Sequence, residues 1–191
     1  MRETMKTILL KDLPERVQDN IQTDITPYST CLIGIRRRFN KAESQLLGTG
    51  TFIRMKDYHC ILTACHVVEY LKKYEALGLG LSEDEHNYYI KNEHLRFELI
   101  AKSVEESSGP DLSIIILPQA ELGAIKARKS FYSLDRHVEG ERIRQIDINT
   151  DLLCACGFIE EWTDVVPSSQ DRKIVKSFKA LTLFTGARKL L

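Results

Sequence analysis

Short runs of apolar residues, separated by turn-forming residues, dominate the chain and predict a structure made mostly of β-strands. These runs lie at 31–36, 48–53, 58–63, 97–101, 111–117, 152–158 and 179–184. The run at 111–117 is the most apolar and is closed by Pro118, which is typical of a strand buried on both faces. Asp57 and its neighbours predict a hairpin turn between two of the runs. Many short strands favour a barrel or a sandwich over β-α-β units.

One segment has helical spacing instead. Apolar residues at Val67, Val68, Leu71 and Tyr74 predict a short helix directly after His66. Residues 78–94 are polar and dotted with glycine, so they predict a loop with one strand at 88–90.

Composition describes an ordinary soluble globular protein. The 191 residues fit one domain or two small packed barrels, with 43% hydrophobic and 28% charged residues. Lysine plus arginine and aspartate plus glutamate number 27 each, so the net charge is zero. This balance gives no electrostatic reason to expect a nucleic acid or an anionic membrane as partner. The basic clusters at 36–38 and 188–189 are short and are interpreted as solvated segments.

The sequence favours a cytoplasmic protein. No stretch approaches the ~20 apolar residues that cross a bilayer. The apolar run Thr7–Leu10 is too short for the hydrophobic region of a secretory signal. The five cysteines are an odd number, and reduced thiols inside a cell are the simplest interpretation.

Three local patterns carry the functional hypothesis. In Gly48-Thr49-Gly50, two glycines beside a strand permit a close backbone approach or a bulge. The segment 62–68 is a strand that delivers His66 to the start of the predicted helix. In the segment 109–115, Asp111 enters the buried strand 45 residues after His66.

In this order the three segments resemble the trypsin-like serine peptidases. In that family a G-x-G-F-type strand precedes a T-A-x-H segment, and a D-x-A-[IV]-[IVL] segment follows. The resemblance spans roughly residues 30–160 and implies an all-β, trypsin-like β-barrel fold with one short helix after the histidine. The first barrel would be complete over 31–145 and the second partial over 146–191, with 1–30 as an N-terminal extension. Gly157-Phe158 resembles the G-[YF]-P segment that opens the second barrel, with Ile159 in place of the proline.

The resemblance implies a role for two residues. His66 would be the general base and Asp111 the acid that orients it. A serine hydroxyl is a poor nucleophile at neutral pH and needs such a base within hydrogen-bond reach. A carboxylate holds the imidazole in the right tautomer and stabilises the imidazolium. The implied reaction is hydrolysis of a peptide bond in a protein or peptide substrate, with no cofactor and no metal.

The nucleophile is missing from the pattern. The family's serine lies in a G-x-S-G-[GS] loop, and no such segment follows Asp111. The serines in that interval are Ser113, Ser130, Ser133, Ser168, Ser169 and Ser177, and none precedes a glycine. Only 34 residues follow Gly157, too few for a full second barrel. We therefore expect a truncated or degenerate relative without triad-dependent peptidase activity of its own, and whether the natural protein is an enzyme stays open.

Three other interpretations compete with this one. The pairs His59-Cys60 and Cys65-His66, with Cys154-x-Cys156, contain possible metal ligands. Paired zinc ligands are usually separated by two or more intervening residues. Residues 60 and 65 on one strand would also face opposite sides, so core cysteines are favoured. Cys65 as a nucleophile is disfavoured because neighbours in sequence rarely have the geometry for proton transfer. The third interpretation is a non-catalytic module that binds a protein or peptide on a protease-like barrel. The pattern predicts neither the specificity nor the oligomeric state.

Overall fold

The computed structural model describes residues 14–38, 41–81, 87–102, 110–136, 153–167 and 173–184. The helices are α1 (Glu15–Ile25), α2 (Cys65–Leu71) and α3 (Leu122–Lys126), with 3-10 turns η2 (Thr26–Tyr28), η3 (Asn92–His94) and η4 (Gln119–Glu121). The strands are β1 (Ser29–Arg38), β2 (Lys41–Met55), β3 (Tyr58–Thr63), β4 (Ala76–Gly80), β5 (Asn87–Lys91), β6 (Arg96–Ala101), β7 (Leu112–Ile116), β8 (Tyr132–Ser133), β9 (Leu153–Pro167) and β10 (Lys173–Phe184).

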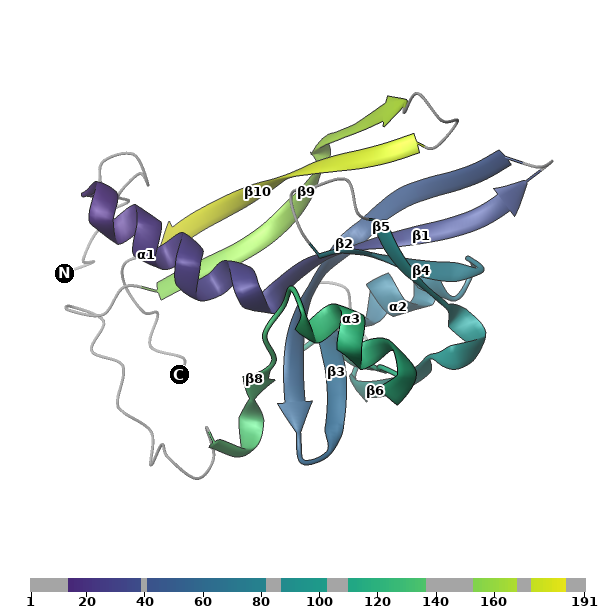
Figure 1. Ribbon diagram of the computed structural model, residues 1–191, viewed down its shortest axis with the longest axis horizontal. Helices are drawn as coiled ribbons and strands as arrows, with labels where there is room; N and C mark the ends of the chain where they lie inside the picture. The colour runs from purple at the N-terminus through teal and green to yellow at the C-terminus, as the bar shows by residue number, and fades with distance from the viewer. Residues whose placement is uncertain are drawn as a thin grey trace.

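Most of the strands belong to one sheet with the order β5-β4-β1-β2-β3-β7-β6 (Figure 1). All neighbours in this order are antiparallel, and the short β8 adds to β2 in parallel. The two end strands, β5 and β6, are consecutive in the chain and are joined through η3. In the described part of the chain, no hydrogen-bonded ladder closes the sheet between them. The observed architecture is therefore a mostly antiparallel β-sheet that is compatible with a β-barrel.

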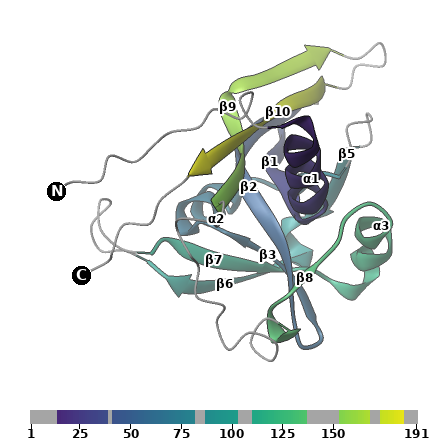
Figure 2. The same ribbon diagram turned by 90° about the vertical axis from the view of Figure 1, so that its left-hand side faces the viewer.

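A second, two-stranded sheet lies over β1 and β2. Strands β9 and β10 pair as a long antiparallel hairpin, which Figures 1 and 2 show crossing the outer side of the larger sheet. The backbone N–H of Phe158 donates to Oγ1 of Thr49 at 2.8 Å. The Phe158 ring packs beside a small buried cluster of Cys31, Ile33 and Leu46. The hairpin is thus attached to the strand that carries the first sequence motif.

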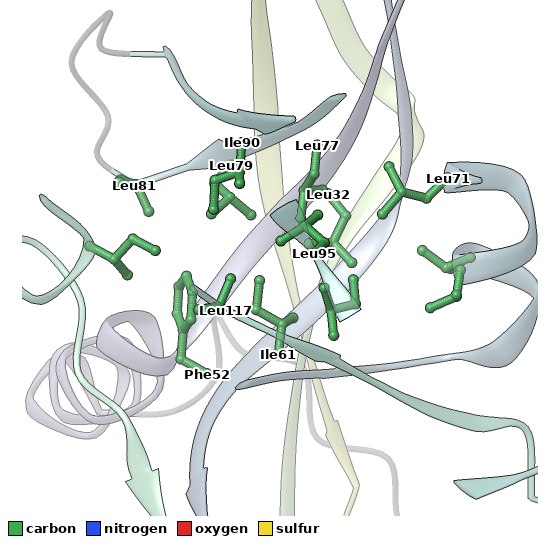
Figure 3. Close-up of a cluster of buried hydrophobic side chains, with 14 of the residues drawn as sticks. Leu32, Phe52, Ile61, Leu71, Leu77, Leu79, Leu81, Ile90, Leu95 and Leu117 are labelled. Carbon is green, nitrogen blue, oxygen red and sulfur yellow. The ribbon is translucent and has the colours of Figure 1, made fainter. Parts of the chain in front are cut away.

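The main core fills the inner side of the curved sheet (Figure 3). Its side chains come from most strands of the sheet and from α2 and α3. Among the fully buried members are Leu32, Phe52, Ile61, Leu71, Leu77, Ile115 and Ile125. Removing these apolar surfaces from water is the main driving force that holds strands of distant sequence together. In α2 the buried residues are Cys65, Val67, Val68 and Leu71, so the predicted amphipathic helix packs one face on this core.

The predicted strands at 31–36, 48–53, 58–63 and 97–101 are confirmed within β1, β2, β3 and β6, and the hairpin turn at Asp57 is also present. The strand at 111–117 is confirmed as β7, in which Ser113, Ile114 and Ile115 are buried. The later strands are longer than the apolar runs predicted, because β9 and β10 continue into polar sequence.

The predicted loop at 78–94 is wrong at its start, where β4 pairs with β1 and β5. The glycines of this segment allow β4 to pack closely against β1 and do not form a turn. A Cβ at Gly80 would lie 2.4 Å from Sγ of Cys31, and one at Gly78 would lie 3.0 Å from Cδ1 of Ile35. Glycine is the only residue that allows β4 to pack this tightly against β1.

Helices α1 and α3 are not predicted by the apolar pattern. Helix α1 lies within the predicted N-terminal extension, 1–30, and the division into a first barrel over 31–145 and a second over 146–191 stays a prediction. At 11 residues α1 is the longest helix in the described ranges, and none of those helices has the length and apolar character of a membrane span.

Candidate active site

The sheet brings the two predicted site residues together at the ends of two neighbouring strands. Strands β3 and β7 are antiparallel, and Thr63 at the end of β3 pairs with Ser113 near the start of β7. The chain leaving β3 enters α2 and presents His66, while Asp111 directly precedes β7. Because an antiparallel pair places the end of one strand beside the start of the other, residues far apart in sequence meet here.

His66 and Asp111 form a direct hydrogen-bonded pair. Nδ1 of His66 lies 2.5 Å from Oδ2 of Asp111. The other carboxylate oxygen, Oδ1, accepts the backbone N–H of Cys65 at 2.8 Å. The side chain of His66 is 62% exposed and that of Asp111 37% exposed, so the pair lies at the surface. Among the described residues, none forms a hydrogen bond with Nε2 of His66, and this nitrogen is therefore available to a further group.

The charge on Asp111 is stabilised by these contacts. Its pKa is lowered mainly by the hydrogen bond from His66, and the backbone N–H of Cys65 adds to the effect, whereas partial burial opposes it. The carboxylate is thus ionised at neutral pH and is an acceptor only. An acceptor at Nδ1 places the ring proton on that nitrogen and leaves Nε2 with a free lone pair, which is the tautomer that a general base needs.

The first motif, Gly48-Thr49-Gly50, supports the start of α2. A Cβ at Gly48 would lie 2.8 Å from Cγ2 of Val67, the residue that follows His66. Oγ1 of Thr63 donates to the carbonyl of Thr49 at 2.8 Å, which ties the end of β3 to the same motif. The β1–β2 ladder also shifts register opposite Gly48, between Leu32 and Ile33. Both the predicted close approach and the predicted bulge are confirmed.

Thr49 links this motif to the second hairpin, a role the sequence pattern did not reveal. Its carbonyl accepts from Thr63, and its hydroxyl oxygen accepts from the N–H of Phe158. Gly157 and Phe158, singled out as the segment that resembles the opening of a second barrel, therefore contact the strand that supports the site.

None of the described serines is hydrogen-bonded to His66. Ser113 is buried in β7, and Ser133 accepts from Arg54 at 3.2 Å. Ser168 and Ser169 lie outside the described residues, as does the side chain of Ser177. In the described part of the chain, the His66–Asp111 pair therefore has no serine hydrogen-bonded to it.

The cysteine-based alternatives gain no support from the geometry. Cys65 lies on α2 and not on the strand with Cys60, which corrects the assumption that both share β3. Cys31, Cys60 and Cys65 are buried and form no disulfide, and burial raises the pKa of the Cys60 thiol to about 11. Within the described ranges no group of three or more histidine, cysteine, aspartate or glutamate residues is placed to hold a metal ion. The side chains of Cys154 and Cys156 lie outside those ranges.

Two charged residues beside the pair were not predicted. Glu69 on α2 and Lys102, which follows β6, form an ion pair close to Asp111. The sequence offered one signal, the three-residue spacing of His66 and Glu69, which places both on one side of a helix.

The chain matches no known protein family, no curated protein and no solved structure. The family resemblance therefore depends on the three motifs alone.

Proposed function

We propose that this chain is a homologue of the trypsin-like serine peptidases in which His66 and Asp111 are the base and the acid of a catalytic triad. The observation that carries the proposal is the 2.5 Å contact between Nδ1 of His66 and Oδ2 of Asp111. It supports the family's roles because it engages the correct ring nitrogen. The sheet supports the same proposal, since its end strands are joined through η3 and it is compatible with the family's first barrel.

In such a triad the proton transfers follow from the geometry of the base. As the serine oxygen attacks the carbonyl carbon of the peptide bond, its proton moves to Nε2 of the histidine. The carboxylate, hydrogen-bonded to Nδ1–H, stabilises the resulting imidazolium. The histidine then gives the proton to the leaving amine, and water hydrolyses the acyl-enzyme in a second cycle of the same transfers. His66, with an exposed side chain, fits this role toward a protein or peptide substrate.

The sequence carries no serine in a G-x-S-G-[GS] segment, so we propose that the chain alone does not perform triad-dependent hydrolysis. This favours a second candidate function, a non-catalytic module that binds a protein or peptide on a protease-like sheet. The observation behind it is that the described serines leave His66 without a nucleophile beside it.

A serine-directed fluorophosphonate probe distinguishes these functions. We expect no covalent labelling of the wild-type chain, because attack on phosphorus needs a serine that His66 can deprotonate. Labelling is measured by intact-protein mass spectrometry, with His66→Ala and the exposed-histidine control His94→Ala. Labelling lost only in His66→Ala would show a working nucleophile, favour the peptidase over the binding module and contradict the proposed inactivity. Labelling that is present, and to the same extent, in all three proteins would contradict a role for His66 as base.

A further inference from the structure

A second pair of charged side chains, Glu69 and Lys102, lies beside the His66–Asp111 pair. Glu69 stands on α2 one helical turn after His66. Glu69 stands three residues after His66, so the two side chains project from the same side of the helix. Oε1 of Glu69 forms an ion pair with Nζ of Lys102, and both side chains are about half exposed. The pair therefore joins α2 to the end of β6.

The register of β6 and β7 places Lys102 next to Asp111. Ala101 is the partner of Leu112 in this antiparallel ladder. Continuing the register by one residue sets Lys102 opposite Asp111. Helix α2 thus carries His66 and Glu69. Asp111 lies just before β7, and Lys102 lies just after β6. Both Glu69 and Lys102 are near enough to Asp111 to interact with its charge.

We propose that the Glu69–Lys102 ion pair positions the His66–Asp111 pair, by fixing α2 against β6 and by holding the lysine charge away from Asp111. The proposal rests on the proposed function, because it assigns a positioning role at the same site. Glu69 and Lys102 are positioning residues and not catalytic ones, since among the described residues neither forms a hydrogen bond or ion pair with His66.

The charges around the ion pair support this role. Lys102 has a raised pKa, mainly through its hydrogen bond and charge interaction with Glu69 and to a smaller extent through Cys65 and Asp111. Glu69 has a pKa lowered mainly by Lys102, while Asp111 acts in the opposite direction and Lys72 reinforces the lowering. Lys102 therefore lies in the field of both carboxylates. If it loses Glu69, it is free to compete with His66 for Asp111.

Two single substitutions that break the same ion pair test the proposal, because they change the charge near Asp111 in opposite directions. Lys102→Met removes a cation and leaves Glu69 unpaired, so the pKa of Asp111 should rise. Glu69→Gln releases Lys102 toward Asp111, so the pKa of Asp111 should fall further. A pair whose charges do not act on the site would leave the Asp111 titration unchanged in both variants. The measurement is the pH titration of the Asp111 carboxyl carbon by NMR in the full chain.

Matched controls come from β6 itself. Arg96 and Glu98 form an exposed ion pair on this strand, with Nε and Oε1 3.2 Å apart, and their variants Arg96→Met and Glu98→Gln should leave the Asp111 titration unchanged. Lys102→Arg keeps the cation and should restore the wild-type curve. Shifts of the same sign in both test variants, or shifts no larger than the controls, would overturn the proposal. The proposed function is tested separately by removing the imidazole of His66, so the two can fail independently.

Discussion

Asparagine in place of Asp111 should move the ring proton of His66 from Nδ1 to Nε2. The N–H of Cys65 donates to Oδ1, which keeps the amide oxygen of an asparagine on that side. The amide NH₂ then faces Nδ1 of His66, where Oδ2 stood at 2.5 Å, and Nδ1 has to accept instead of donate. A histidine protonated on Nε2 cannot take a serine proton. In serine proteases with a complete triad, the same exchange lowers kcat by about 10⁴-fold.

The nitrogen chemical shifts of His66 at neutral pH report the tautomer directly. The matched control is Asp135→Asn, because Asp135 also accepts a backbone N–H, from Lys56 at 2.6 Å. It should leave the His66 spectrum unchanged. A spectrum of Asp111→Asn in which Nδ1 still carries the proton would contradict the proposed contact.

Alanine in place of Gly50 should lower the free energy of unfolding by about 1–3 kcal/mol, the usual cost of overpacking a core. The added Cβ would lie 2.4 Å from Cγ2 of Ile61 and 3.1 Å from Cδ2 of Leu32. Both neighbours are fully buried, so neither has open space to move into. The destabilisation should appear as a lower denaturation midpoint with an unchanged slope in urea.

Gly123→Ala is the matched control for this substitution. Gly123 lies in α3, is exposed, and has no atom within 4 Å of the position of an added Cβ. Alanine is a better helix former than glycine, so this variant should be neutral or more stable. Equal destabilisation by both substitutions would contradict the close approach of β2 to β1 and β3.

The sequence predicted the parts of the fold that depend on local apolar pattern and turn chemistry. The strands around Gly50 and Asp111 and the helix after His66 follow from such patterns. Strand β4 did not, because its glycines resemble a loop in sequence, and only the neighbouring strand β1 shows why Gly80 is needed. The length of β9 was predicted only in part, because its apolar run ends well before the strand does.

The candidate site, like the fold, could be predicted from the sequence only in part. His66 and Asp111 could be paired from sequence because a family resemblance supplied both positions. Lys102 could not, because its place beside Asp111 depends on the register between β6 and β7. Likewise, the contacts of Thr49 with Thr63 and Phe158 join three distant segments, and no local pattern encodes such a junction.

The pairing of His66 with Asp111 is tested most directly by the pH titration of the Asp111 carboxyl group in the wild type and in His66→Phe. We predict a wild-type pKa below the ordinary aspartate value and a higher pKa in the variant, where the imidazole donor is lost and the backbone N–H groups of residues 65 and 66 remain. Because the folded pKa is lowered, the stabilising contact is complete above the ordinary pKa and is lost as the pH falls through the folded one. Titration of Asp111 at the same pH in both proteins would show that the imidazole does not bind the carboxylate, and would contradict the proposed pairing.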